Sequence, residues 1–240
     1  MKTFSISLIQ SKQQELLKYI ALFLMTLDHF GKYFFTCNEG FCITTLLGRI
    51  VFPIFAYLLM FNYIYHSKHQ RAYVIKLLFF SLIAQYPYAL LFHPLDSTGE
   101  MNILFSLGTG LGVVYILDTL KEKFKKKVAQ YLLGFITIYI AFVITELLDS
   151  SMLLPLTVWS FYLYIKNPIL LNLVGLVASI LLLNFETQPY YVASSLMSLL
   201  LIYFFNKTNI GVHRRVAGIF FYIYYPLHLV AILLIGSYVY

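Results

Sequence analysis

The 240-residue chain is 60% hydrophobic and only 11% charged, and its mean hydropathy is +0.80. This composition excludes a soluble domain, in which about a quarter of the residues are charged. The formal net charge of +7 does not indicate a nucleic-acid partner, because the lysines and arginines form short clusters between apolar segments, as in the cytoplasmic loops of membrane proteins.

Apolar segments long enough to cross a hydrocarbon core of ~30 Å recur along the whole chain. No remaining stretch would hold a separate soluble domain, so we predict an all-α integral membrane protein with a single domain over residues 1–240, embedded in the lipid bilayer. Its polytopic bundle is expected to contain about nine transmembrane helices. The expected spans are 16–36, 43–64, 73–92, 102–119, 128–147, 150–165, 169–184, 189–206 and 216–237.

The loops between these spans alternate in charge. Basic residues precede the first span and fill every second loop, whereas the intervening loops carry acidic residues. By the positive-inside rule the basic side is cytoplasmic. We therefore expect the N-terminus inside and, with nine spans, the C-terminus outside. Cys37 and Cys42 share one short loop, and would pair only if that loop faces an oxidising space.

Ionisable residues in the first span are the main candidates for a site, because a charge at membrane depth is costly and usually functional. Lys18 and His29 are about three helical turns and ~16 Å apart, so they share one helix face. Histidine titrates near neutrality and is a common general base. Asp28 points about 100° away from His29 and is expected to pair with Lys32 or to reach another helix. The alternative is a structural salt bridge beside a hydrogen-bonded core histidine.

Two further spans carry polar residues at membrane depth. Arg49 follows Gly48, where its planar guanidinium could hold a carboxylate or phosphate, or could anchor the helix at the interface. Pro53 in the same span frees a backbone carbonyl. In the last span Pro226 bends the helix before His228. We expect His228 to face inward, as a second proton-transfer group or as a satisfied core histidine.

Asn102 opens the fourth span, ahead of Gly108, Gly110 and Gly112. Small residues at this spacing are typical of close helix packing, while Asn102 itself is a candidate to line a site. No third ligand with suitable spacing joins the two intramembrane histidines, so we predict no metal site. The other histidines fall in predicted loops and are expected on the surface: His66, His69, His93 and His213.

Five segments in this order resemble the TraX family, which includes the conjugative pilin acetylase. They are residues 18–29, which end in Met-Thr-Leu-Asp-His, residues 48–55 (Gly-Arg-Ile-Val-Phe-Pro-Ile-Phe), residues 71–78 (Arg-Ala-Tyr-Val-Ile-Lys-Leu-Leu), residues 102–111 (Asn-Ile-Leu-Phe-Ser-Leu-Gly-Thr-Gly-Leu) and residues 224–229 (Tyr-Tyr-Pro-Leu-His-Leu). The resemblance covers nearly the full length. The chain departs from the family at Lys76, where arginine is usual, and after Asp149, where the family tends to have Asp-Tyr-Gly.

The family is similar in turn to the larger transmembrane acyltransferases of type 3. These carry a basic residue, ten intervening residues and a histidine in the first span, a spacing that Lys18 and His29 reproduce with lysine in place of the usual arginine. The resemblance implies acyl transfer in a bacterial cytoplasmic membrane, with acetyl-CoA or another acyl-CoA as donor. The acceptor that it implies is the N-terminal amine of a pilin. A peptide, glycan or lipid acceptor is equally compatible with the residues.

On this hypothesis His29 is the general base or the acyl carrier, and Asp28 orients or charge-balances the site. Arg49 and Asn102 would stabilise the tetrahedral oxyanion or position the thioester, and His228 would be a second proton-transfer group. The phosphates of the coenzyme would be held by four basic residues: Lys18, Lys68, Arg71 and Lys76.

Two non-enzymatic functions remain open. A transporter or flippase would line its path with the same buried charges, although the sequence contains no internal repeat of the kind common in transporters. A membrane assembly factor would only bind a pilin or peptide, and its function would not depend on a single base such as His29.

Overall fold

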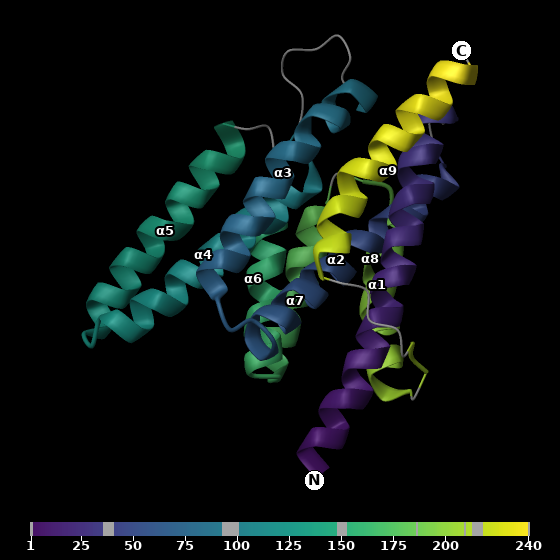
Figure 1. Ribbon diagram of the computed structural model, residues 1–240. Helices are drawn as coiled ribbons and strands as arrows, with labels where there is room; N and C mark the ends of the chain where they lie inside the picture. Colours follow the sequence, from purple (N-terminus) through teal and green to yellow (C-terminus); the bar gives the residue numbers. More distant parts are fainter. Residues whose placement is uncertain are drawn as a thin grey trace. The chain divides into compact units, whose positions relative to one another are not determined.

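The computed structural model describes residues 2–35, 41–92, 101–147, 153–185, 187–208, 210–212 and 218–239, with side chains for those between residues 12 and 238 (Figure 1). Several residues that the sequence singled out lie outside this part of the chain: Cys37, His93, Asp149 and His213. Within it, every regular element is an α-helix, which confirms the all-α part of the predicted fold class.

Nine helices occur in the described residues, and each overlaps one predicted span. They are α1 (Lys2–Phe34), α2 (Ile43–Tyr65), α3 (Gln70–Phe92), α4 (Ile103–Lys123), α5 (Lys127–Leu147), α6 (Leu153–Lys166), α7 (Leu170–Leu183), α8 (Pro189–Lys207) and α9 (Gly218–Val239). The helix ends agree with the predicted spans to within a few residues, apart from the start of α1.

Six of these helices are long and apolar enough to cross a membrane: α2, α3, α4, α5, α8 and α9. They indicate a multi-pass membrane protein. α1 is long but carries several charged residues, and α6 and α7 have 14 residues each. A helix of that length extends ~21 Å, which is less than the ~30 Å hydrocarbon core.

The chain packs as two compact units. The terminal unit comprises Met1–Leu58 and Asn184–Tyr240, and so contains α1, most of α2, α8 and α9. The central unit comprises Leu59–Leu183, with the end of α2 and helices α3 to α7. The predicted single domain over residues 1–240 stays a prediction.

In the terminal unit, α1 and α9 run parallel to each other (Figure 1). Tyr19 in the middle of α1 contacts Phe221 near the start of α9, and a Cβ at Gly236 would collide with Tyr33 near the ends of both helices. α2 runs antiparallel to α1. Thr44 of α2 lies beside Gly31 of α1, whereas Gly48, one turn later in α2, lies beside the earlier residue Asp28. α9 therefore lies beside the second half of α1 and runs in the same direction.

The helix α8 runs parallel to α2 and antiparallel to α1. Near the start of α8, the Tyr191 hydroxyl accepts from the Cys42 backbone N–H at 3.1 Å. Near its end, Asn206 donates to the Tyr57 hydroxyl at 2.9 Å. The Gln13 side chain of α1 donates to the Thr208 carbonyl just after α8. The residues after α8 therefore lie beside the first part of α1.

The central unit is built around α4. Its partner α3 is antiparallel, and Gly110 of α4 lies so close to Val158 of α6 that a Cβ there would be 2.8 Å from the valine Cβ. Asp118 of α4 accepts hydrogen bonds from the hydroxyls of Tyr63 and Tyr162. Lys166 lies 3.5 Å from the same carboxylate. This cluster ties the end of α2 to α4 and α6.

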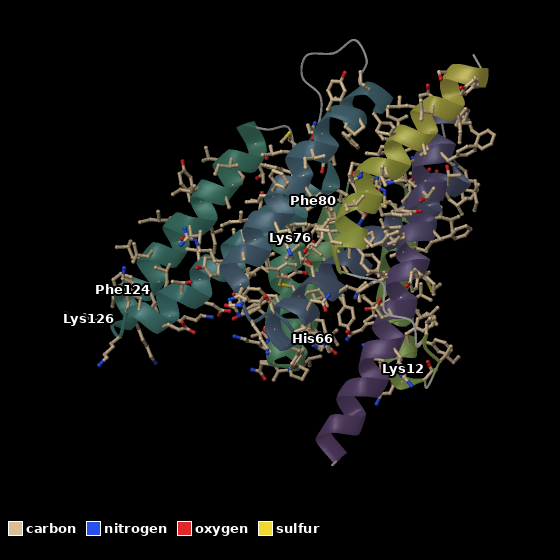
Figure 2. The ribbon with its side chains drawn as sticks, viewed as in Figure 1. Lys12, His66, Lys76, Phe80, Phe124 and Lys126 are labelled. Atoms are coloured by element: carbon tan, nitrogen blue, oxygen red, sulfur yellow. The ribbon has the colours of Figure 1, made fainter. Side chains whose placement is uncertain are left out.

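The basic helix ends gather at one end of the central unit. Gln130 at the start of α5 bonds to carbonyl oxygens of Lys121 and Phe124 at the end of α4, and Lys126 lies at that junction (Figure 2). Asn172 of α7 donates to the Leu163 carbonyl of α6. Antiparallel neighbours thus bring the basic loops together, as the alternation of loop charges predicts.

Candidate functional site

His29 of α1 and His228 of α9 meet inside the terminal unit. His29 Nδ1 lies 2.8 Å from His228 Nε2, and the rings are nearly parallel, with an interplanar angle of 10°. Both residues are buried, with 8% and 6% of their surface exposed. His228 Nδ1 also lies 3.1 Å from the carbonyl oxygen of Tyr224, one turn earlier in α9. The two histidines predicted separately from the sequence therefore form one hydrogen-bonded pair.

Two tyrosines of α9 enclose this pair. The Tyr225 ring lies edge-on to both imidazoles, with centroids 6.0 Å from His29 and 5.3 Å from His228. The Tyr224 ring stacks on His228 at 5.4 Å, and its hydroxyl lies 2.8 Å from Thr26 Oγ1. Because the Thr26 hydroxyl donates to a backbone carbonyl one turn earlier in α1, Tyr224 is the donor to Thr26. Tyr224 therefore holds α9 against α1 beside the histidines.

Asp28 is buried where α1 packs on α2, with 7% of its surface exposed. One carboxylate oxygen accepts from Lys32 Nζ at 2.8 Å, which confirms the predicted pairing. The other oxygen has no hydrogen-bond partner in the described part of the chain. Arg49 adds a second positive charge that acts on this carboxylate. Asp28 thus interacts electrostatically with two cations, and it directly precedes His29 in α1.

Arg49 reaches from α2 to the start of α8. Its Nη1 donates to Asn184 Oδ1 at 3.4 Å, and its guanidinium lies 5.8 Å from the centre of the Tyr191 ring. Asn184 is fully buried and also accepts from Ser195 at 3.2 Å. These contacts hold the half-buried guanidinium against the bundle. The predicted roles of Arg49, in binding an anion or in anchoring the helix at the interface, stay predictions.

Lys18 lies on the same side of α1 as His29. Its Nζ pairs with Glu15 at 2.7 Å and lies 5.0 Å from the Phe221 ring of α9. Phe221 and His228 are two turns apart on α9, so both Lys18 and His29 face that helix. The predicted shared face is confirmed.

Asn102 belongs to the central unit and caps α4. Its side-chain oxygen accepts from the Leu104 backbone N–H at 3.1 Å, and its amide nitrogen donates to the Ser81 carbonyl and to Gln85. The residue is fully buried. Both ends of its amide are therefore used in capping and in holding α3 to α4. None of these hydrogen bonds tests its predicted role in stabilising the oxyanion or positioning the thioester, and that role stays a prediction.

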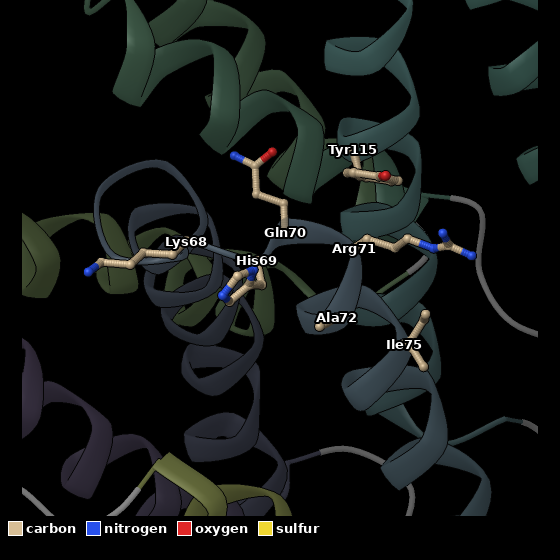
Figure 3. Close-up of a pocket in the computed structure, with 7 residues that line it drawn as sticks. All are labelled: Lys68, His69, Gln70, Arg71, Ala72, Ile75 and Tyr115. Atoms are coloured by element: carbon tan, nitrogen blue, oxygen red, sulfur yellow. The ribbon is translucent and has the colours of Figure 1, made fainter.

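The predicted coenzyme residues Lys68 and Arg71 line an open pocket of about 450 Å³ in the central unit, at the start of α3. His69, Gln70 and Tyr115 also line it. In Figure 3 the charged ends of Lys68 and Arg71 point away from each other, so they do not form a single phosphate clamp. A third predicted residue, Lys76, is exposed further along α3 and does not line this pocket (Figure 2).

No group of three or more histidine, cysteine or acidic side chains that could hold a metal ion occurs in the described ranges. Cys42 is disulfide-bonded, and the other cysteine of the sequence, Cys37, lies outside those ranges.

Several residues around the site are not identified by sequence reasoning. Asn184 and Tyr191 were expected only as parts of spans, and Thr26 as a neutral residue within the first span. The one signal for Asn184 is an uncharged polar side chain at the end of an apolar segment. That signal is weak, because such residues also occur at membrane interfaces. Its contact with Arg49 joins residues 135 positions apart in the chain.

Comparison with known proteins gives one relative and one family. A protein of Dichelobacter nodosus described as "Probable fimbrial assembly protein FimC, serogroup H1" is 32% identical over 106 residues, which cover 40% of this chain and 42% of that protein. The chain thus spans less than half of the length of this relative. No solved structure matches. The TraX protein family matches residues 13–236, a range that contains the histidine pair, Asp28 and Arg49, and the chain therefore belongs to the TraX family.

Proposed function

We propose that this protein is a membrane-embedded acyltransferase that moves an acyl group, with acetyl as the first candidate, from acyl-CoA to an amine or hydroxyl. The observation that carries the proposal is the buried, hydrogen-bonded pair of His29 and His228. Buried ionisable groups inside a membrane protein usually mark function, and a histidine is suited to take a proton from a nucleophile near neutral pH. Asp28 and Arg49 supply fixed charges in the same unit.

In the proposed reaction, His29 removes a proton from the acceptor as its nitrogen or oxygen attacks the thioester carbonyl. The carbon–sulfur bond then breaks, and the proton leaves with the coenzyme thiolate as a thiol. Arg49 is the candidate to stabilise the oxyanion of the tetrahedral intermediate, an interaction whose removal typically costs about 10²–10³ in rate. Asp28 balances the positive charges of Lys32 and Arg49.

The donor is proposed to enter from the cytoplasmic side, where Lys18 of the terminal unit would contact its phosphates. The topology rests on α1 and α9. Since these helices are parallel neighbours, the chain crosses the membrane an odd number of times if both span it. The helices α6 and α7 are consecutive and antiparallel, so counting both or neither keeps the total odd. We therefore propose an odd number of spans, nine if α6 and α7 also cross, with the two chain ends on opposite sides.

The acceptor is proposed to be a pilin or a similar exported subunit. Its support is the printed name of the Dichelobacter nodosus relative, which refers to fimbrial assembly. A free N-terminal amine titrates at about 7.7–8.0, so a general base such as His29 would supply the neutral nucleophile. Peptides, glycans and lipids are the further classes to test as acceptors.

The first experiment measures binding and turnover of radiolabelled acetyl-CoA by the purified protein in nanodiscs. We expect slow thioester hydrolysis or self-labelling by the wild type. A His29→Gln variant should lose about 10²–10⁴ in rate while keeping its fold, and His66→Ala, at an exposed turn after α2, is the matched control. If neither the wild type nor the variants bind acetyl-CoA, the hypothesis that acyl-CoA is the donor fails.

A non-enzymatic assembly factor is the second candidate, and the fimbrial assembly name of the relative also supports it. The two functions differ in how they depend on the histidine pair. An assembly factor would bind a pilin peptide equally well with His29→Gln, and the pilin would show no added acetyl mass. An acyltransferase would leave a mass increase on the pilin that the variant abolishes.

A further inference from the structure

The histidine pair is anchored at one end by a group that can only accept a hydrogen bond. His228 Nδ1 lies 3.1 Å from the backbone carbonyl of Tyr224, and a carbonyl oxygen has no proton to donate. The hydrogen atom of this bond must therefore reside on His228 Nδ1. In a neutral imidazole only one nitrogen carries hydrogen, so His228 Nε2 is left as an acceptor.

The position of the proton on His228 also determines the position of the proton on His29. His29 Nδ1 is 2.8 Å from His228 Nε2. Because His228 Nε2 is an acceptor, His29 Nδ1 must carry the proton and donate it. The remaining nitrogen, His29 Nε2, then holds the basic lone pair of the neutral pair. One backbone carbonyl thus sets the tautomer of both histidines.

We propose that His228 is a positioning residue that fixes His29 in the Nδ1–H tautomer and thereby leaves the basic lone pair of the pair on His29 Nε2. This inference concerns the same site as the proposed acyl transfer. Only its expected effect on turnover rests on that proposed function. The tautomers themselves follow from the hydrogen bonds. His228 does not touch the substrate in this arrangement.

The arrangement also gives a route for the positive charge. When His29 Nε2 takes the acceptor proton, His29 carries hydrogen on both nitrogens. The proton on Nδ1 can then pass to His228 Nε2, which leaves His29 with hydrogen on Nε2 and makes His228 the cation. The Tyr224 carbonyl still accepts from Nδ1 of that cation, and a hydrogen bond to a charged donor is stronger than to a neutral one. The charge therefore moves one residue away from the reacting atoms.

The aromatic residues restrict both rings to these orientations. Tyr224 stacks on His228, and Tyr225 lies edge-on to both imidazoles. A flip of the His228 ring would remove Nδ1 from the Tyr224 carbonyl while the surrounding rings stay in place. The bond between the Tyr224 hydroxyl and Thr26 is not part of the tautomer chain, which makes Tyr224→Phe a matched control that keeps the carbonyl and the ring.

The test is nitrogen NMR of protein labelled with ¹⁵N at histidine, in nanodiscs at a pH where both rings are neutral. The two signals are assigned by their loss in His29→Gln and His228→Gln. We expect the Nδ1–H tautomer at both residues in the wild type and in Tyr224→Phe. In His228→Leu, which removes the acceptor, His29 should move to the Nε2–H form, and turnover should fall by about 10²-fold or more.

His228→Gln is the conservative variant, because its amide can donate to the Tyr224 carbonyl and accept from His29. It should keep the Nδ1–H form of His29 and restore part of the turnover lost in His228→Leu. An Nε2–H signal for either histidine in the wild type overturns the inference, as does an unchanged His29 tautomer in His228→Leu. If the tautomers are as expected but no variant or wild type turns over acyl-CoA, the inference on the pair stands and the proposed function fails.

Discussion

The contact between Gly48 and Asp28 offers a sharp test of the packing in the terminal unit. A Cβ added at Gly48 would lie 2.3 Å from Asp28 Cγ and 2.5 Å and 2.6 Å from the two carboxylate oxygens. No real contact is that short, so Gly48→Ala must displace the carboxylate. The displaced group would lose its 2.8 Å contact with Lys32.

The expected change in the free energy of unfolding of Gly48→Ala is the difference between two opposing contributions. Overpacking a filled site costs about 1–3 kcal/mol, whereas replacing glycine by alanine inside a helix gains about 1 kcal/mol. Since the loss of the ion pair adds to the first term, we expect Gly48→Ala to lower the free energy of unfolding by about 1–2 kcal/mol. Gly175→Ala in α7 is the control, because no atom lies within 4 Å of its added Cβ. It should be neutral or stabilising by up to about 1 kcal/mol.

The assay is reversible unfolding in mixed micelles of mild detergent and SDS, followed by circular dichroism and completed as a double-mutant cycle with Asp28→Ala. Without the carboxylate the new methyl group has space, so Gly48→Ala should become neutral or stabilising in that background. We expect a coupling energy of about 1 kcal/mol or more, within the range for residues in contact. Additive effects, or a Gly48→Ala variant as stable as Gly175→Ala, would refute the placement of Asp28 against α2.

Three further predictions concern the central unit and the topology. Asn102→Ala removes the cap of α4 and should lower the free energy of unfolding by about 1–2 kcal/mol, which the same micelle titration measures; an unchanged stability would contradict the capping role. Tyr162→Phe deletes a donor to the Asp118 carboxylate and should cost about 1–3 kcal/mol, while Tyr164→Phe, on the same helix, should cost less. Alkaline phosphatase fused after Tyr240 should be active outside the cell and inactive when inserted between α4 and α5; activity at both places would contradict an odd number of spans.

The order and type of the helices were predictable because membrane insertion imposes a simple rule on sequence. Each spanning segment must be apolar and long, and each short loop reveals its side by its charge. The nine helices in the described part of the chain accordingly overlap the nine predicted spans. The pairing of Asp28 with Lys32 was also predictable, since residues four apart on a helix are neighbours. The same holds for the shared face of Lys18 and His29.

The partners of the polar residues depend instead on which helices pack together. His29 and His228 are separated by 199 positions in the chain, and no periodicity within α1 or α9 predicts that they form a pair. The burial of Asp28 depends on a glycine of α2. Asn102 looked like a site residue, yet its hydrogen bonds to α3 and α4 use both ends of its amide.

Hydrophobic length and loop charge are local properties, so they predict from the amino-acid sequence a helical membrane protein, the positions of its helices and the side chains that are costly to bury. The tertiary structure sets which of these side chains meet. It joined His29 to His228 and Arg49 to Asn184, and it divided Lys68 and Arg71 from them into a separate unit. The physical reason is that a hydrogen bond requires two groups about 3 Å apart, a condition that helix packing sets and that no single segment encodes.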